Sequence, residues 1–562
     1  MAQFISTIRN VTSPSYTFVP AGLGLAIAAA VFVSPLPASA QIMSNTPISI
    51  GQKPQLFFDN HMVEMVHYMT RRVHRPLKHK RNPLIVKDKP WEEDLYIRTG
   101  SFCVAWDPVE KLFKCWYNDL AWDYDAFMGR DGDLSGLLPK DWFDSQDNRW
   151  LYAESEDGVK WRKPLLDYRD VDGQKTNICI GRNDYGQVTV GSFFLDTLAQ
   201  DPKKRFKSLH WRQRGRTADI RTAHSADGRS WVTNDDPVIV GGNHQRRFGD
   251  EMMVYPDPVT GQYLLNVREM NMAERLFHYK VPVQVEKNWD YPYYPDAPLL
   301  MNKRRVFVTN SDNLNNWPTL REVMVPDDRL DNIDEAHYSM PMLRIGDIFV
   351  AFLNCYHEVD NTMDVRLLYS RDAYNWTPVD RGCPYLERGS VEEEAWDRYM
   401  AEIGNSVILR DDGIYLFYGG SACHHDWWEF GEKEGLDMPD EPGVSKFFLG
   451  LATLRPEGFV SLDSTVRPGL LLTRPFISNG SQLQINAVCE KKGYVEVELT
   501  DAEDNVIAGY ERSACDRFSG DAARHVITWN GESQLPGEVL AKGAKLRFFN
   551  QRAALYSFRI TE

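Results

Sequence analysis

Acidic residues recur just ahead of short apolar stretches of strand character between residues 91 and 406. The segments are WEEDLYIRTGSF (91–102), RNDYGQ (182–187), FGDEMM (248–253), NIDEAHYSM (332–340) and YMAEIGNS (399–406). Cleavage of a glycosidic bond needs two carboxyl groups, one to protonate the leaving oxygen and one to attack or to activate water. If the strands start around a common axis, these acids converge there. Their repulsion and partial burial would then raise the pKa of one acid beside an ionised partner.

Three acids are assigned roles from these segments. We expect Asp250 to stabilise the transition state or to modulate a neighbouring pKa, Glu335 to act as the general acid, and Asp94 to act as base or nucleophile. Other acids of the same segments stand as alternatives: Glu402, Glu251 and Asp334. The competing interpretation of each is a solvated loop acid.

Basic and aromatic residues near the same strand starts are expected to bind the hydroxyl groups, carboxylate or sulfate of a sugar. They are Arg98, Trp91, Arg247, His337 and His424. A further segment, HWRQRGRTADIR (210–221), holds four arginines, which a solvated strand edge explains more simply than an anionic sugar. No metal and no cofactor is expected, because the eight cysteines include no CxxC pair. The adjacent histidines 424 and 425 would point to opposite faces of a strand and chelate poorly.

The elements that must position these residues are indicated by a repeated turn. The segments LYAESEDGVKW, RTAHSADGRSW, VFVTNSDNLNNW and RLLYSRDAYNW each place a Ser six residues before a Trp, at residues 161, 231, 317 and 376. A degenerate fifth copy has Thr453 six residues before Phe459. Five copies, 59 to 86 residues apart, indicate a structural repeat. Short strands and turns lie between them, so we predict an all-β fold, a five-bladed β-propeller over residues 41–465. A long array of β-sandwiches is the alternative.

Two further segments flank the predicted propeller. Residues 466–562 consist of strands and polar turns with no copy of the repeat, which predicts a C-terminal β-sandwich. Residues 1–40 combine Arg9, the apolar run at 21–33 and the small residues ASA at 38–40. This pattern predicts a signal peptide and a secreted or periplasmic protein, with an uncleaved anchor as the alternative.

Charge and cysteine content narrow the classes of function. The formal net charge of −15 argues against binding to nucleic acid or to an acidic lipid surface. After signal removal no membrane association is expected. Cys103 and Cys115 flank a predicted hairpin, where export would permit a disulfide. Two buried thiols are the favoured interpretation there, and a disulfide is the alternative.

The repeated turn is similar to one in five-bladed propeller glycosidases, namely glycoside hydrolase families 32, 43, 68 and 117 and the mannoside phosphorylases of family 130. FGDEMMVYPDPVTGQYLL (248–265) resembles the Arg-Asp-Pro segment of these families, which implies that Asp250 is the stabilising acid. Glu251 stands where these families have Pro. HYSMPML (337–343) resembles their Glu-Cys-Pro segment, but Ser339 occupies the position of the acid.

The resemblance implies an exported, exo-acting glycoside hydrolase that removes a terminal sugar from a plant or algal glycan, with an anionic sugar among the options. A phosphorylase of the family 130 type and a non-catalytic glycan-binding propeller are the alternatives. A polysaccharide lyase, which would use a Tyr or His base, is a further one.

Overall fold

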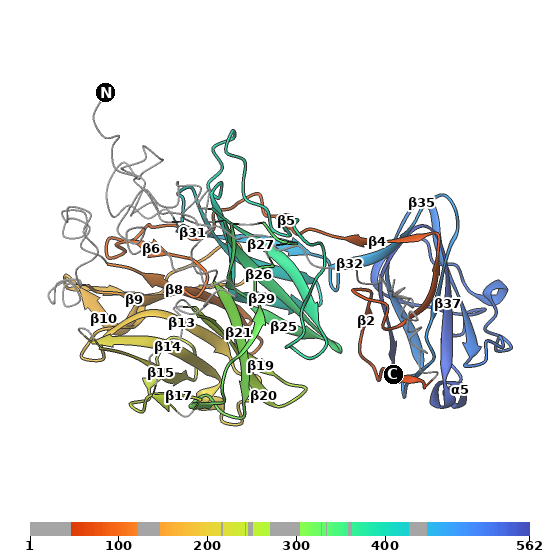
Figure 1. The fold of residues 1–562 in the computed structure, drawn as a ribbon, viewed down its shortest axis with the longest axis horizontal. Helices are drawn as coiled ribbons and strands as arrows, with labels where there is room; N and C mark the ends of the chain where they lie inside the picture. The colour runs from red at the N-terminus through yellow and green to blue at the C-terminus, as the bar shows by residue number, and fades with distance from the viewer. Residues whose placement is uncertain are drawn as a thin grey trace, which may run out of the picture. The chain divides into compact units, whose positions relative to one another are not determined.

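The computed structural model describes residues 46–121, 146–214, 217–241, 243–244, 251–269, 304–327, 329–332, 334–357, 362–425 and 447–562. These residues are almost entirely strands and turns (Figure 1), and the single α-helix among them is α5 (Gly537–Lys542). The predicted all-β class is therefore confirmed. The predicted signal peptide lies outside the described residues. No helix in the described ranges has the length and apolar character to cross a membrane.

Five successive antiparallel meanders make up most of the chain. The first contains β7 (Phe102–Asp107), β8 (Leu112–Asp119), β9 (Arg149–Ser155) and β12 (Ile178–Ile180), with β6 (Leu95–Tyr96) beside β8. The second contains β13 (Gln187–Leu195), β14 (Phe206–Arg214), β15 (Thr217–Ser225) and β16 (Val232–Thr233). The third contains β19 (Met252–Asp257), β20 (Gln262–Glu269), β21 (Arg305–Ser311) and β23 (Arg321–Met324).

The fourth and fifth meanders continue this pattern. In the fourth, β24 (Glu335–Ser339) and β25 (Met342–Ile345) both pair with β26 (Ile348–His357), followed by β27 (Thr362–Ser370) and β28 (Thr377–Pro378). The fifth contains β29 (Met400–Arg410), β30 (Gly413–Ser421) and β31 (Phe447–Leu454), and β5 (Leu77–Lys78) from near the N-terminus pairs with β31. Every residue of β8 and β26 is buried, so both faces of these strands are covered.

The first strands of the meanders meet one another through hydrogen bonds. The amide of Gly191 donates to the carbonyl of Gly100 at 2.9 Å, and the amide of Val254 donates to Ser192 Oγ at 2.9 Å. Asn405 Nδ2 donates to Ser192 Oγ at 3.0 Å and to the carbonyl of Val254 at 3.1 Å. These contacts join the first strands of the second, third and fifth meanders to one another and to the turn before the first strand of the first meander.

The Trp of all four full copies of the repeated turn donates to the carbonyl three residues before it, whereas the Ser accepts the amide three residues on in only three of them, because Ser311 Oγ instead donates to the carbonyl of Asn316. In HSADGRSW, Ser225 Oγ accepts the amide of Gly228 at 2.8 Å, and Trp231 Nε1 donates to the carbonyl of Gly228 at 3.0 Å. Trp161 and Trp376 donate to the third residue before them in the same way, at 3.1 and 2.9 Å. The Ser ends the third strand of its meander in all four full copies. The predicted role of this segment as a hairpin turn is confirmed.

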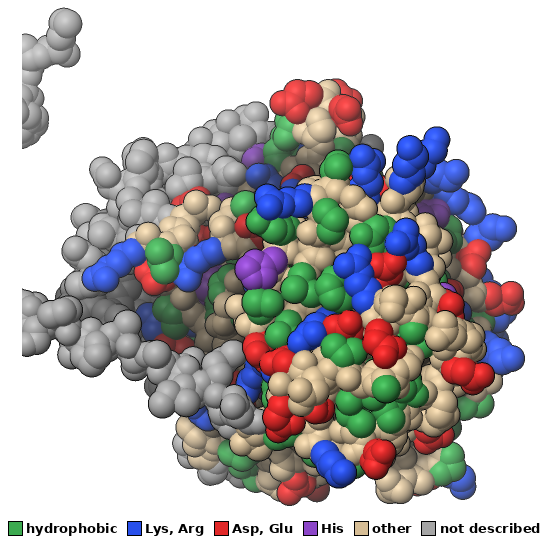
Figure 2. All heavy atoms as spheres, turned by 90° about the vertical axis from the view of Figure 1, so that its right-hand side faces the viewer, with side chains coloured by type: hydrophobic (Ala, Val, Ile, Leu, Met, Phe, Trp, Pro, Cys, Tyr) green, Lys and Arg blue, Asp and Glu red, His purple; other side chains and the backbone are tan. Residues whose placement is uncertain are grey.

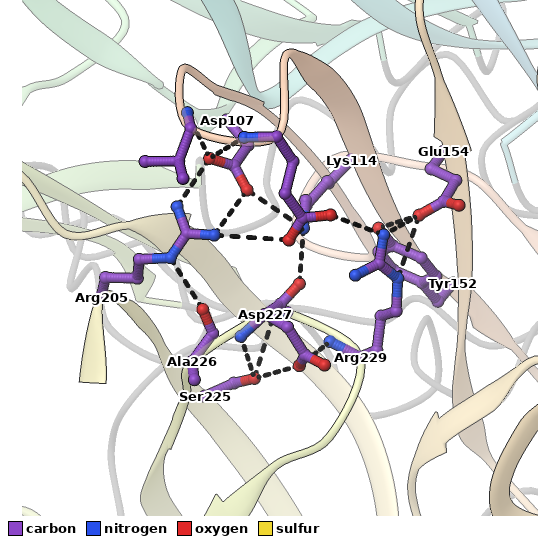
Figure 3. Close-up of polar contacts among 12 residues, drawn as sticks. Asp107, Lys114, Tyr152, Glu154, Arg205, Ser225, Ala226, Asp227 and Arg229 are labelled. Carbon is purple, nitrogen blue, oxygen red and sulfur yellow. Dashed lines mark hydrogen bonds and ion pairs between the residues drawn. The ribbon is translucent and has the colours of Figure 1, made fainter. Parts of the chain in front are cut away.

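Charged side chains form ion pairs and hydrogen bonds between the second meander, including its turn, and the first meander (Figure 3). Lys114 Nζ donates to the carbonyl of Asp227 at 2.6 Å and lies 3.1 Å from Asp107 Oδ2. Arg205 forms a bidentate pair with Asp107, at 2.6 and 2.7 Å, and Arg229 donates to Glu154 Oε2 at 2.5 Å. Trp231 and Trp116 meet edge to face, with centroids 6.0 Å apart. The turn thus connects neighbouring meanders.

The C-terminal part is a ten-stranded sheet that also includes N-terminal strands. Its members are β1 (Ile48–Ser49), β2 (Gln55–Leu56), β3 (Val63–His67), β4 (Met69–Val73), β32 (Val460–Ser464), β33 (Gly469–Thr473), β34 (Phe476–Ile477), β35 (Gln482–Asp501), β36 (Asp521–Val526) and β37 (Ala544–Thr561). The boundary predicted at 465/466 therefore leaves out residues 48–73 and 460–464. Acidic and basic side chains are interspersed with hydrophobic ones on the face drawn in Figure 2.

Shorter pairings complete the described structure. A two-stranded sheet contains β10 (Leu166–Val171) and β11 (Gln174–Thr176), and a three-stranded one contains β17 (Ile239–Val240), β18 (Asn243–His244) and β22 (Asn316–Trp317).

Cys103 and Cys115 are both free and buried. Cys103 lies opposite Trp116 and Cys115 opposite Val104, so the two thiols point to opposite faces of the hairpin. The favoured interpretation of two buried thiols is therefore confirmed, and the disulfide is not formed.

Candidate functional site

A buried ion pair lies at the centre where the first strands meet. Arg98, in the turn before β7, is 3% exposed, and Glu402, on β29, is 1% exposed. Arg98 Nε donates to Glu402 Oε1 at 3.0 Å, and the amide of Thr99 donates to Glu402 Oε2 at 3.3 Å. Arg98 also donates to the hydroxyl of Tyr96 at 2.9 Å. The pair joins the first meander to the fifth.

A second carboxyl group, that of Glu251, lies against the same turn. A Cβ atom placed on Gly100 would lie 2.1 Å from Glu251 Oε2, and Gly100 has a φ of +70°. Only glycine therefore leaves room for Glu251 in this backbone conformation. Burial alone would lower the pKa of Arg98, but Glu402 first, then Tyr96 and Tyr338, and last Glu251 raise it well above its ordinary value. Glu251 and Glu402 thus act on one guanidinium from two different meanders.

Three guanidinium groups surround the ring of Tyr338 on β24. The Cζ atoms of Arg268, Arg304 and Arg98 lie 3.6, 4.8 and 5.7 Å from its centroid. Cations over an aromatic face are attracted by the ring's quadrupole. His425 contacts the same tyrosine, with ring centroids 5.2 Å apart. The centre therefore combines two carboxyl groups with a concentration of positive charge.

Uncharged side chains next to this centre form a network of hydrogen bonds. Asn354 Nδ2 donates to Ser339 Oγ at 2.7 Å and to the carbonyl of Ile403 at 2.8 Å, while its Oδ1 accepts the amide of Ile403 at 2.9 Å. Ser339 and Thr99 share a hydrogen bond of 2.6 Å. Ser339, which stands at the acid position of the similar families, is thus a buried hydroxyl that links the fourth meander to the first, and Asn354 links the fourth meander to the fifth.

Glu335 lies on β24 in a different set of contacts from the one expected. Its Oε2 is 3.4 Å from Arg366 Nη2, and its Oε1 is 3.6 Å from His337 Nε2. Burial would raise the pKa of Glu335, but the hydrogen bond and charge of His337 and the charge of Arg366 lower it to about 2. A general acid must retain its proton near neutral pH. These neighbours therefore argue against the general-acid role predicted for Glu335.

Asp94 and Trp91 lie in the first meander. The Asp94 amide donates to Asp119 Oδ1 at 2.8 Å, and its side chain is 3% exposed. Trp91 belongs to the hydrophobic core, and its Nε1 donates to Asn177 Oδ1 at 2.7 Å. Trp91 therefore packs in a hydrophobic core, and its role in sugar binding stays a prediction.

The remaining predicted residues are placed as follows. Asp334 is partly buried beside Glu335, and the ring of His424 stacks on that of Tyr399 at 3.8 Å. Asp250 and Arg247 lie outside the described residues.

Of the predicted set, the structure brings together Arg98, Glu251 and Glu402. It adds residues that sequence reasoning missed: Tyr96, Arg268, Arg304, Tyr338 and His425. Arg268 and Arg304 stand at the ends of strands, where basic residues are usually solvated, so no sequence signal distinguished them.

Comparison with protein-family models and with curated proteins finds no match. Among solved structures, the chain is similar to one described as a glycoside hydrolase, with a TM-score of 0.43, 14% identity and coverage of 69% of this chain and 93% of that one. It is similar to a β-1,2-mannobiose phosphorylase from Listeria innocua, with a TM-score of 0.42, 11% identity and coverage of 67% and 96%. It is also similar to an N-acetylgalactosamine deacetylase from F. plautii, with a TM-score of 0.40, 13% identity and coverage of 68% of this chain and 95% of that one. Likenesses this weak carry no function to this chain.

Proposed function

We propose that the protein is a glycoside hydrolase, and that its five meanders are the blades of a five-bladed β-propeller. The observation that carries the proposal is that two carboxyl groups, those of Glu402 and Glu251, lie near Arg98 and the turn that follows it. Glu402 belongs to the first strand of the fifth meander, and Glu251 directly precedes the first strand of the third. Paired carboxyl groups on separate elements are what glycosidic bond cleavage requires.

The contacts suggest which carboxyl group acts as base or nucleophile and which acts as general acid. Glu402 is ion-paired with Arg98 and accepts the amide of Thr99, which suits a base or nucleophile. We assign the role of general acid, which protonates the leaving oxygen, to Glu251. Asp250, its neighbour in sequence, and Asp94 remain alternatives for the second carboxyl group.

The arginines and tyrosines of the centre would hold the sugar. Tyr338 offers an aromatic ring, and Arg268 and Arg304 offer donors for hydroxyl groups or for the carboxylate or sulfate of an anionic sugar. We propose an exported, exo-acting enzyme for a plant or algal glycan. Export rests on residues 1–40, and exo action rests on the analogy with propellers that bind chain ends.

A glycoside phosphorylase is the second candidate, because three guanidinium groups beside two carboxyl groups would also suit a phosphate. The test is a screen of neutral, uronate-containing and sulfated oligosaccharides, with and without inorganic phosphate. A hydrolase releases a free sugar in both conditions, whereas a phosphorylase releases a sugar phosphate only with phosphate. Binding without cleavage of any glycan would indicate a glycan-binding propeller.

A further inference from the structure

The fourth meander gathers ionisable side chains on one face of its sheet. In the register of β24 and β26, His337 lies opposite Cys355 and Glu335 lies opposite His357. Directly opposite residues, and residues two apart on a strand, share a face. The four side chains therefore form a compact block, and all four are less than 9% exposed. None of them belongs to the pair formed by Glu402 and Arg98.

One oxygen of Glu335 is the focus of this block. Cys355 Sγ lies 3.4 Å from Glu335 Oε1, and His337 Nε2 lies 3.6 Å from the same oxygen. The three ligand-type atoms of Glu335, His337 and Cys355 all lie within 4.8 Å of one another. Arg366 approaches the other oxygen, Oε2, at 3.4 Å. Oε1 is therefore turned toward the imidazole and the thiol, while Oε2 is turned toward the guanidinium.

These separations are those of ligands around a tetrahedral metal ion. Zinc bonds of about 2.0–2.3 Å imply separations of about 3.4 Å between oxygen and nitrogen and about 3.6 Å between oxygen and sulfur. The observed 3.6 and 3.4 Å agree with these values to about 0.2 Å. His337 is 1% exposed, and within the described ranges its Nδ1 has no hydrogen-bond partner. The atom that faces Glu335 is Nε2 on the other side of the ring, so Nε2 is the ligand atom and Nδ1 is left to a hydrogen-bond partner beyond the ligands.

We propose that Glu335, His337 and Cys355 form a binding site for a divalent metal ion, and that the ion is Zn²⁺. A thiolate, an imidazole and a carboxylate are ligands that zinc accepts together, whereas magnesium and calcium prefer oxygen. Cys355 binds as the thiolate, so its proton is released to solvent when the metal binds. The fourth position is filled by a water molecule or another oxygen ligand.

The surroundings suit such a site. Two positive charges on the metal are balanced by the carboxylate of Glu335 and the thiolate of Cys355, which leaves a neutral buried unit. Arg366 is paired with Asp364 at 2.5 Å, and Asp364 is 3.0 Å from His357 Nε2, so the outer charges are also compensated. This site departs from the sequence prediction of no metal, because the ligands come from two strands whose register the sequence did not supply.

Metal content tests the proposal directly. The full chain with any affinity tag removed is stripped with a chelator, incubated with Zn²⁺ and desalted, and its metal is counted by mass spectrometry. Titration calorimetry then gives Kd for Zn²⁺. We expect one equivalent in the wild type, a higher Tm with Zn²⁺, and Kd weakened at least about 100-fold in Cys355→Ser and His337→Ala. Cys115→Ser, another buried strand cysteine, and Asp334→Asn, the acid next to Glu335, are the matched controls and should bind as the wild type does.

Co²⁺ bound to the wild type keeps the test decisive if a variant fails to fold. A thiolate ligand gives a charge-transfer band in the near ultraviolet, and tetrahedral Co²⁺ gives intense visible absorption. Wild-type protein that takes up no metal, or that binds Co²⁺ without a thiolate band, would overturn the proposal. Folded Cys355→Ser and His337→Ala variants with wild-type affinity would also overturn it. Because the readout is metal binding, its outcome is independent of whether any glycan is cleaved.

Discussion

Arg98 and Glu402 lie 304 residues apart in sequence, and their side chains meet at 3.0 Å in the protein interior. A buried pair of this kind is costly to break from one side, because the remaining charge is left without its partner. Here the pair also joins the turn before β7 to β29, so it fixes the position of a carboxyl group that we assign to the reaction.

Replacement of Arg98 separates these two roles. Arg98→Met should lower the free energy of unfolding by about 3–5 kcal/mol and reduce kcat/KM, since Glu402 is left buried and unpaired. The double variant Arg98→Met/Glu402→Met should regain much of the stability but none of the activity. Urea unfolding and initial rates measure the two quantities. Full activity in the double variant would contradict the assignment of Glu402.

Gly100→Ala tests the close approach of Glu251. The added methyl group would lie 2.1 Å from Glu251 Oε2 and would also strain a backbone with a φ of +70°. We expect lower activity together with lower stability. Gly173→Ala is the matched control, because Gly173 has a φ of +76° but no atom within 4 Å of the added Cβ. If both variants lost the same activity, the backbone conformation rather than the contact with Glu251 would be responsible.

His210 predicts a specific dependence of stability on pH. Burial, together with the charges of Arg212 and Arg221, lowers the pKa of His210 to about 3, although Asp219 opposes this. An unfolded histidine takes up a proton below a pH of about 6.5, so the unfolded state binds more protons than the folded one between these values. Stability should therefore fall as the pH falls from about 6.5 toward 3, by at most about 1.4 kcal/mol per pH unit from this residue. The residue hydrogen-bonds Tyr185 and Ser208, both at 2.9 Å.

The measurement compares His210→Gln with the wild type by chemical unfolding at several pH values. The difference in unfolding free energy between the two proteins should change with pH below about 6.5 and stay constant above it. A constant difference across the whole range would show that His210 titrates normally in the folded state.

The repeated turn should be stabilised by its serine in the three copies where the hydroxyl accepts the amide three residues on. Ser225→Ala removes the acceptor of the Gly228 amide and should lower the unfolding free energy by about 1–3 kcal/mol, because that amide is buried. Ser155→Ala and Ser370→Ala, which hold Gly158 and Ala373 in the same way, should behave alike. Ser230→Ala, at an exposed position of the same turn, serves as the control. An equal effect of Ser230→Ala would contradict this account.

The repeat and the turn could be predicted because they depend on residues close together in sequence. Ser225, Asp227 and Trp231 make their hydrogen bonds within one turn, so their spacing alone indicates it. The convergence of acids could be predicted in part, since Glu251 and Glu402 lie at strand starts.

Contacts between distant strands could not be predicted in this way. Glu335 was expected to hold a proton, but Arg366, His337 and Cys355 come to it from the register of β24, β26 and β27. Strands β3 and β4 pair with β33 and β32, about 400 residues later in the chain, and nothing in their short sequences indicates this pairing. The ring of arginines around Tyr338 likewise depends on which strand ends meet.

The central claim is that Glu402 and Glu251 carry out glycosidic bond cleavage at the centre of the five meanders. The most direct test measures kcat/KM and substrate Kd for Glu402→Gln and Glu251→Gln on a glycan that the wild type cleaves. We predict that each variant keeps its fold and its Kd but loses at least about 100-fold in kcat/KM, the size of a general acid or base contribution. Wild-type turnover in both folded variants would contradict the claim.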